Sequence, residues 1–145
     1  NTGALTVTDS EVRTNTSTSS GGGVNNSGSM TVQNSMFLSN TGYFGAGIYN
    51  VGTLTAIGAT FSSNSSGSFE GGGIANAGTA VVENSTFYAN VAYAGGGIQN
   101  SRILTISNST FDANVVSNPD GWGGGVHEFG PRVDVDRLPK DRGPS

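Results

Sequence analysis

Short runs of alternating apolar and polar residues recur along most of the chain. In one run, for example, Leu104 and Ile106 are apolar while Thr105 between them is polar. A period of two is that of a β-strand, whose successive side chains point to opposite faces. Three such runs, separated by Asn or Gly, occur in each stretch of roughly 24 residues, and no helical period is visible. The pattern therefore predicts short strands and no helices.

These runs belong to an internal repeat. The third glycine of each glycine cluster is Gly23, Gly47, Gly73, Gly97 or Gly125, so the spacings are 24, 26, 24 and 28 residues. Residues 1–15 match the second half of the same unit, with Val12 where the others have Phe. Three short strands per unit of ~24 residues predict an all-β parallel β-helix, or solenoid, of about five coils.

Stacked coils place equivalent residues above one another. The sequence predicts four inward apolar columns: Val24/Ile48/Ile74/Ile98/Val126, Leu5/Met30/Leu54/Ala80/Leu104, Val7/Val32/Ala56/Val82/Ile106 and Phe37/Phe61/Phe87/Phe111. It also predicts two asparagine columns at the corners: Asn26/Asn50/Asn76/Asn100 and Asn40/Asn64/Asn90/Asn114. We expect these asparagines to adopt left-handed bends and to hydrogen-bond the asparagine one coil away.

The composition agrees with such a rod and excludes several kinds of function. Only 11% of the 145 residues are charged, and the net charge of −4 provides no basic surface for nucleic acid. No apolar run approaches the ~20 residues of a membrane-spanning helix. The absence of cysteine excludes disulfides and thiolate metal sites. We expect no cofactor and no metal.

Two tetrapeptides recur in register: G-G/A-G-I/V at 21–24, 45–48, 71–74, 95–98 and 123–126, and F-x-x-N at 37–40, 61–64, 87–90 and 111–114. They resemble the GGA-I/L/V and FxxN repeats of polymorphic outer membrane protein passengers, with Gly in place of the motif's Ala. More broadly, the chain resembles the right-handed parallel β-helix repeats of large bacterial surface proteins. The resemblance implies a right-handed β-helix on the bacterial cell surface or in the extracellular space, often an adhesin, with a host or cell-surface protein or glycan as partner.

The repeat predicts two regions, with β-helix repeats in residues 1–130 and a non-repeat tail in residues 131–145. The tail is interpreted as a cap, a linker or sequence foreign to the repeat. Because the first coil lacks its opening strand and residues 123–128 supply one, head-to-tail stacking into filaments is a further hypothesis. The alternative is that the natural neighbours of these ends are more repeats.

Catalytic chemistry finds little support in the pattern. A glycoside hydrolase needs two carboxylates within roughly 5–9.5 Å, and a polysaccharide lyase needs a basic residue near acids that hold a cation. The acids of residues 1–130 fall in different columns; Glu70 and Asp120 form the closest grouping, two coils apart. His127, the sole histidine, lies in an outward column. We therefore assign no catalytic residue. Whether the protein is an enzyme stays open, and the pattern favours a protein that is not one.

Binding is better supported, by the loops of varying length between each FxxN motif and the next glycine cluster. Stacking would align their aromatic residues as a strip flanked by two acids: Tyr43, Phe44, Phe69, Glu70, Tyr93, Asp120 and Trp122. These rings could simply shield the corner of the core, or they could contact a sugar or a protein.

The sequence thus favours a structural or adhesive rod that binds through surface loops. The alternative is a carbohydrate-active β-helix protein that binds or degrades polysaccharide at the same loop edge. A third reading, ice binding, rests on the outward column Thr6/Thr31/Thr55/Val81/Thr105, although the neighbouring columns are irregular and exposed strand Thr is ordinary.

Overall fold

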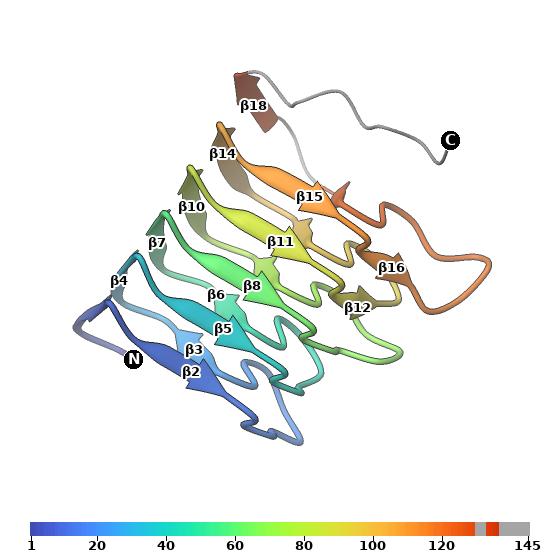
Figure 1. Ribbon diagram of the computed structural model, residues 1–145, viewed down its shortest axis with the longest axis horizontal. Helices are drawn as coiled ribbons and strands as arrows, with labels where there is room; N and C mark the ends of the chain where they lie inside the picture. Colours follow the sequence, from blue (N-terminus) through green and yellow to red (C-terminus); the bar gives the residue numbers. More distant parts are fainter. Residues whose placement is uncertain (130–132, 137–145) are drawn as a thin grey trace.

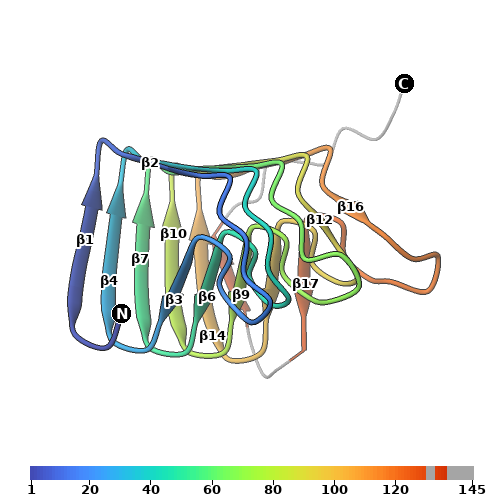
Figure 2. The same ribbon diagram turned by 90° about the horizontal axis from the view of Figure 1, so that it is seen from below.

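The computed structural model describes residues 1–129 and, as backbone, residues 133–136. Every regular element in these residues is a β-strand, and the chain winds through about five coils as a right-handed parallel β-helix (Figure 1). Each full coil contributes one strand to each of three parallel sheets, so the predicted solenoid fold is confirmed. Figure 2 shows the strands of one sheet lying side by side along the length of the rod.

The three large sheets are named here A, B and D. Sheet A contains β1 (Ala4–Thr8), β4 (Ser29–Gln33), β7 (Thr53–Ile57), β10 (Thr79–Glu83), β14 (Ile103–Ser107) and β18 (Val133–Asp136). Sheet B contains β2 (Glu11–Arg13), β5 (Met36–Leu38), β8 (Thr60–Ser62), β11 (Thr86–Tyr88) and β15 (Thr110–Asp112). Sheet D contains β3 (Val24–Asn26), β6 (Ile48–Asn50), β9 (Ile74–Asn76), β13 (Ile98–Asn100) and β17 (Val126–Glu128). A fourth, two-stranded sheet pairs β12 (Val91–Ala92) with β16 (Val115–Val116) at the loop edge.

The register of the sheets confirms all four apolar columns. Leu54 lies between Met30 and Ala80 in sheet A, and Ile74 lies between Ile48 and Ile98 in sheet D. The five-residue strands of sheet A alternate between buried and more exposed positions, as period-two side chains require. The core therefore runs continuously along the rod axis.

The phenylalanine column forms an uninterrupted stack inside the rod. Consecutive ring centroids from Phe37 to Phe111 are 5.1, 4.7 and 4.7 Å apart, with interplanar angles of 15° or less. Phe37, Phe61 and Phe87 are fully buried. Burial of each ring contributes roughly 1.5–3 kcal/mol, and offset stacking adds ~0.5–1.5 kcal/mol.

The two asparagine columns are buried hydrogen-bonded ladders. In the first, the Nδ2 of each asparagine donates to the Oδ1 of the asparagine one coil further on, at 2.7, 2.7 and 2.6 Å from Asn26 to Asn100. In the second, the corresponding distances from Asn40 to Asn114 are 3.0, 3.0 and 2.9 Å. The predicted hydrogen bonding between coils is thus confirmed.

The predicted left-handed bends at these asparagines are wrong. Among the described non-glycine residues, positive φ occurs at the residue before the second ladder, such as Ser63 and Ala89, and in a separate column that includes Asn34, Asn84 and Asn108. The physical reason is that a ladder side chain must point into the rod to reach its neighbour, so the bend is made by the residue beside it.

The two ends of the rod differ. Core residues Leu5, Val7, Val12 and Val24 at the N-terminal end are only partly buried. At the other end β18, which lies in the predicted non-repeat tail, pairs with β14 and adds a sixth strand to sheet A, where sheets B and D have five. The other residues of that tail, 131–132 and 137–145, lie outside the described residues.

Candidate functional site

The residue immediately before each glycine cluster belongs to a column at the loop edge, named here the loop row: Ser20, Phe44, Glu70, Ala94 and Trp122. Backbone hydrogen bonds set its register, because the amide after each of the first four members donates to the carbonyl of the next member. Gly45, for example, donates to Glu70, and Gly95 donates to Trp122, at 3.1 and 2.9 Å. Although the loops differ in length, these hydrogen bonds restore the register between neighbouring coils before each new coil begins.

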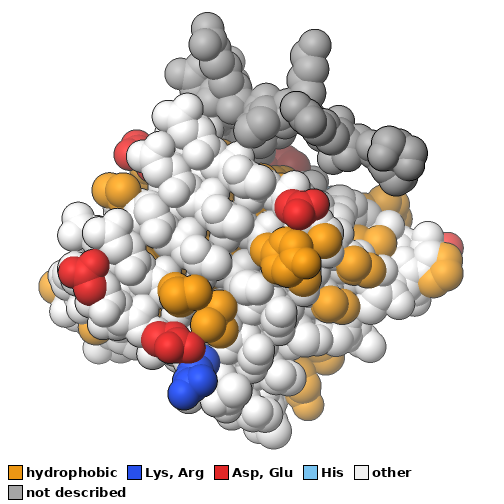
Figure 3. All heavy atoms as spheres, viewed as in Figure 1, with side chains coloured by type: hydrophobic (Ala, Val, Ile, Leu, Met, Phe, Trp, Pro, Cys, Tyr) orange, Lys and Arg blue, Asp and Glu red, His pale blue; other side chains and the backbone are white. Residues whose placement is uncertain are grey.

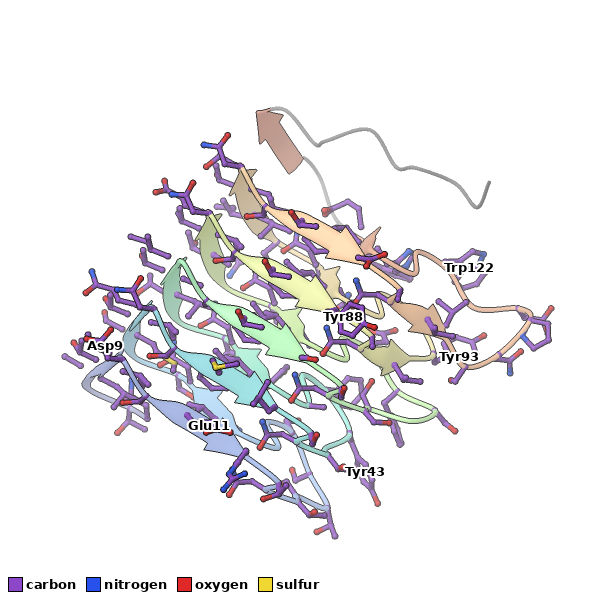
Figure 4. The ribbon with its side chains drawn as sticks, viewed as in Figure 1. Asp9, Glu11, Tyr43, Tyr88, Tyr93 and Trp122 are labelled. Carbon is purple, nitrogen blue, oxygen red and sulfur yellow. The ribbon has the colours of Figure 1, made fainter. Side chains whose placement is uncertain are left out.

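The predicted aromatic strip is present as two ring clusters. In the first, Phe69 stacks on Tyr43 with centroids 4.5 Å apart and meets Phe44 edge-on at 5.3 Å. In the second, Tyr93 meets Trp122 edge-on at 6.3 Å. Figure 4 shows Tyr43, Tyr93 and Trp122 along the same edge of the rod. Tyr43, Phe69 and Trp122 are 45%, 37% and 57% exposed, so these rings do more than fill a corner of the core.

A second column runs parallel to the loop row on the outer face of sheet D. Its members are Asn25, Tyr49, Ala75, Gln99 and His127, as strand pairing shows. Each follows a loop-row residue by five positions, so the two columns face each other across the glycine clusters. Phe44 lies against Tyr49 at 6.4 Å, and Trp122 stacks on His127 at 5.9 Å.

These columns line a hollow on the outer face of sheet D, named here the trough. Its volume is about 230 Å³, and its lining residues are Phe44, Tyr49, Glu70, Ala75, Ala77, Gln99, Ser101 and Phe129. Phe129 also borders a wider, open hollow of about 560 Å³ together with Trp122, His127 and Glu128. Small Ala and Ser side chains thus form the middle of the trough, while aromatic rings stand at both ends.

Three polar groups in or beside the trough have unused hydrogen-bonding capacity. Gln99 is 6% exposed, and its side-chain amide makes no hydrogen bond to any described residue. The Nε2 of His127 is buried without a hydrogen-bond partner. The carboxylate of Glu70 forms no ion pair within residues 1–129, where Arg13–Glu11 at 3.5 Å is the one ion pair.

The structure places six of the seven predicted strip residues in the ring clusters or the trough and leaves Asp120 apart. Asp120 is exposed on the loop after β16, which projects from the rod at the right of Figures 1 and 2. Its backbone N–H donates to Asn118 Oδ1 at 2.9 Å, and it lines neither hollow. That Asp120 flanks the aromatic strip together with Glu70 therefore stays a prediction.

Four side chains that carry a ring or an amide in the two hollows were not among the predicted site residues: Tyr49, Gln99, His127 and Phe129. A signal for the first three exists in the sequence, because a strand position facing outward every coil must form a column. The sequence gives no comparable signal for Phe129, whose backbone N–H donates to Asn100 O in the place that Ser101 and Val51 occupy in earlier coils.

The remaining faces carry scattered polar side chains and a few exposed apolar ones, such as Met36 and Tyr88 on sheet B. Figure 3 shows the side of the rod seen in Figure 1 as mostly uncharged, with isolated acidic groups and one basic group. On sheet A the outward threonine column has the predicted register, interrupted by Val81 and flanked by Ile103, which is 57% exposed. No group of three His, Asp or Glu residues that could hold a metal is found among the described residues.

No helix among the described residues is long and apolar enough to cross a membrane. Comparisons of the chain with protein-family models, with curated proteins and with solved structures find no match. The proposed function is therefore based on the fold and the trough.

Proposed function

We propose that this chain is an extracellular adhesive rod, whose β-helix is a rigid scaffold for a binding face made of the loop row, the edge rings and the outer column of sheet D. The partner is a protein or glycan at a cell surface. The observation that carries this proposal is the gathering of solvent-exposed rings, including Tyr43, Phe69 and Trp122, in ring contacts along one edge of the rod, whereas the exposed apolar side chains on sheets A and B, such as Tyr88 and Ile103, are in no ring pair among the described residues. Exposed aromatic side chains anchor interfaces because they bury a large area at low cost in conformational entropy.

The scaffold suits this task because its sheets and buried side-chain columns hold both ends of every loop. Three parallel sheets, a continuous phenylalanine stack and two asparagine ladders fix the backbone on either side of every loop. Loops on a rigid frame are where binding residues normally occur. The resemblance of the G-G/A-G-I/V and F-x-x-N repeats to those of bacterial surface passengers agrees with an extracellular location.

Binding is favoured over cleavage of a polysaccharide. Glycoside hydrolysis requires two carboxylates on opposite sides of the scissile bond. Among the described residues that line the trough, Glu70 is the one carboxylate. Glu128, in the neighbouring hollow, accepts hydrogen bonds from Asn100 Nδ2 at 2.9 Å with both oxygens and is thereby tied to the asparagine ladder.

An adhesion assay tests the proposal. Fluorescently labelled full-length chain would be added to surfaces coated with mixed cell-surface glycoproteins, before and after enzymatic removal of the glycans. We expect saturable adhesion that falls at least tenfold in the Tyr43→Ala/Phe69→Ala double variant. The matched control is Tyr88→Ala, because Tyr88 is a 48% exposed ring on the outer face of sheet B, away from the loop edge (Figure 4). Absence of saturable adhesion, or equal losses in both variants, would contradict the proposal.

A further inference from the structure

The middle of the trough contains an amide that lacks a partner. Gln99 is more than nine-tenths buried, lines the trough and makes no side-chain hydrogen bond to any described residue. A side-chain amide offers two donors and one acceptor, and those of Gln99 are not used within the described residues. A sugar hydroxyl can accept from such an amide and donate to it at the same time.

Aromatic rings mark both ends of the trough. Phe44 and Tyr49 stand at one end, whereas Phe129 with the stacked Trp122 and His127 stands at the other. Tyr49 and His127 are three strands apart in sheet D, which is roughly 14 Å at the usual strand spacing. This length exceeds a single sugar ring. It fits a short oligosaccharide that runs along the rod axis with an aromatic surface under each end.

The charges in the trough select against acidic glycans. Glu70 lines its middle, and none of the described lining residues is Lys or Arg. The carboxylate of a uronic acid or a sialic acid at this point would meet the like charge of Glu70, which is unfavourable. The hydroxyls of a neutral sugar can instead donate to the Glu70 carboxylate, and such charge-assisted hydrogen bonds are stronger than neutral ones.

A peptide strand fits this surface less well. Strands β6, β9 and β13 beneath the trough are each paired on both sides within sheet D, so no free backbone edge is available for an added strand. A peptide would have to bind by its side chains alone.

We propose that the trough is a binding site for a neutral oligosaccharide, with the rings at its two ends as stacking surfaces and Gln99 and Glu70 as the hydrogen-bonding groups between them. This inference rests on the proposed adhesive function and names the ligand class for the same face.

Isothermal titration of the full-length chain with neutral trisaccharides (maltotriose, cellotriose and chitotriose) and with the acidic trigalacturonate tests the inference. We expect at least one neutral trisaccharide to bind and trigalacturonate not to bind. Kd for the neutral ligand should rise at least tenfold in Gln99→Leu and in Phe129→Ala, and should stay unchanged in Tyr88→Ala. Phe129 is 71% exposed, so its variant keeps the test valid if Gln99→Leu does not fold.

The adhesion assay separates the two proposals. If none of the neutral trisaccharides binds while the chain still adheres to deglycosylated surfaces through Tyr43 and Phe69, the inference is overturned and the adhesive function stands. Binding that is indifferent to Gln99→Leu and Phe129→Ala would equally overturn it. If adhesion itself is absent, the proposed function fails.

Discussion

At the scale of single residues, the asparagines of this chain occupy two different environments. Asn76 is fully buried in a ladder, where its Nδ2 donates to Asn100 Oδ1 at 2.6 Å and to Ile103 O at 2.9 Å while its Oδ1 accepts from Asn50. Asn84 is exposed and has φ of 50°, in a column where Gly58 has φ of 61°. Asn76 suits its position because of the hydrogen bonds that its side chain makes, and Asn84 suits its position because asparagine tolerates a left-handed backbone.

This difference predicts a large loss of stability on substitution of Asn76 and a small change on substitution of Asn84. Asn76→Ala removes one ladder member and leaves buried donors and acceptors in two neighbouring coils without partners, so the free energy of unfolding should fall by about 3 kcal/mol. Asn84→Gly keeps the backbone conformation and should change it by less than ~1 kcal/mol. Urea unfolding followed by circular dichroism measures both. Equal effects in the two variants would contradict the assignment.

At the scale of the strand and its corner, the glycine before each strand of sheet D is required by close packing. A Cβ on Gly73 would lie 2.5 Å from Gly97 O and 2.9 Å from Phe87 Cδ1. The same close approach of a carbonyl recurs at Gly23, Gly47 and Gly97. This explains why the chain has Gly at these four positions of the repeat.

Gly73→Ala should therefore cost about 2–3 kcal/mol, since neither the carbonyl nor the stacked ring can move away freely. Gly3→Ala is the matched control, because nothing lies within 4 Å of a Cβ at Gly3 and its φ is not positive. We expect the control to keep wild-type stability within ~0.5 kcal/mol in the same denaturation assay. A Gly73→Ala protein as stable as the control would show that the corner adjusts more easily than its geometry implies.

Most of the fold could be predicted from the sequence, because the period of two and the spacing near 24 residues fix which side chains are superposed. The binding face could be predicted only in part. Loops of unequal length return to register just before each glycine cluster, so Trp122 joins the loop row while Asp120 is left on the projecting loop. Gln99 lies at an outward strand position that recurs in every coil, but its place in a hollow depends on Glu70 and Phe129 beside it, which no periodicity reveals.

At the scale of the whole molecule, the three sheets do not end at the same coil. With β18 present, sheet A has six strands and sheets B and D have five. Copies stacked head to tail therefore cannot pair in all three sheets at the same time. Asn1 and Glu128 lie at the two ends of one asparagine ladder: Asn1 Nδ2 donates to Asn26 Oδ1, and Glu128 accepts from Asn100 Nδ2. In a head-to-tail stack, Asn1 of one copy would need the place that Glu128 of the other copy occupies.

We therefore predict head-to-tail stacking for a shortened chain that lacks β18. Residues 1–127 lack β18, so sheets A, B and D would each have five strands, with β17 shortened by Glu128, and Asn1 of the next copy could take the place of Glu128. We expect this chain to form concentration-dependent end-to-end oligomers in sedimentation velocity, and the full-length chain to do so much less. Circular dichroism checks that the shortened chain is folded. A folded, strictly monomeric 1–127 at high concentration would remove the stacking hypothesis.

The central claim is that the loop row and the outer column of sheet D form one binding face. Heteronuclear NMR of the ¹⁵N-labelled full-length chain, titrated with the neutral trisaccharide that binds most tightly, tests this most directly. We expect the resonances of the Gln99 side-chain amide and the Trp122 indole N–H to shift, together with the backbone amides of Glu70 and His127, while Tyr88 and the rest of sheet B stay unchanged. Shifts confined to sheets A or B, or no shifts at saturating ligand, would contradict it.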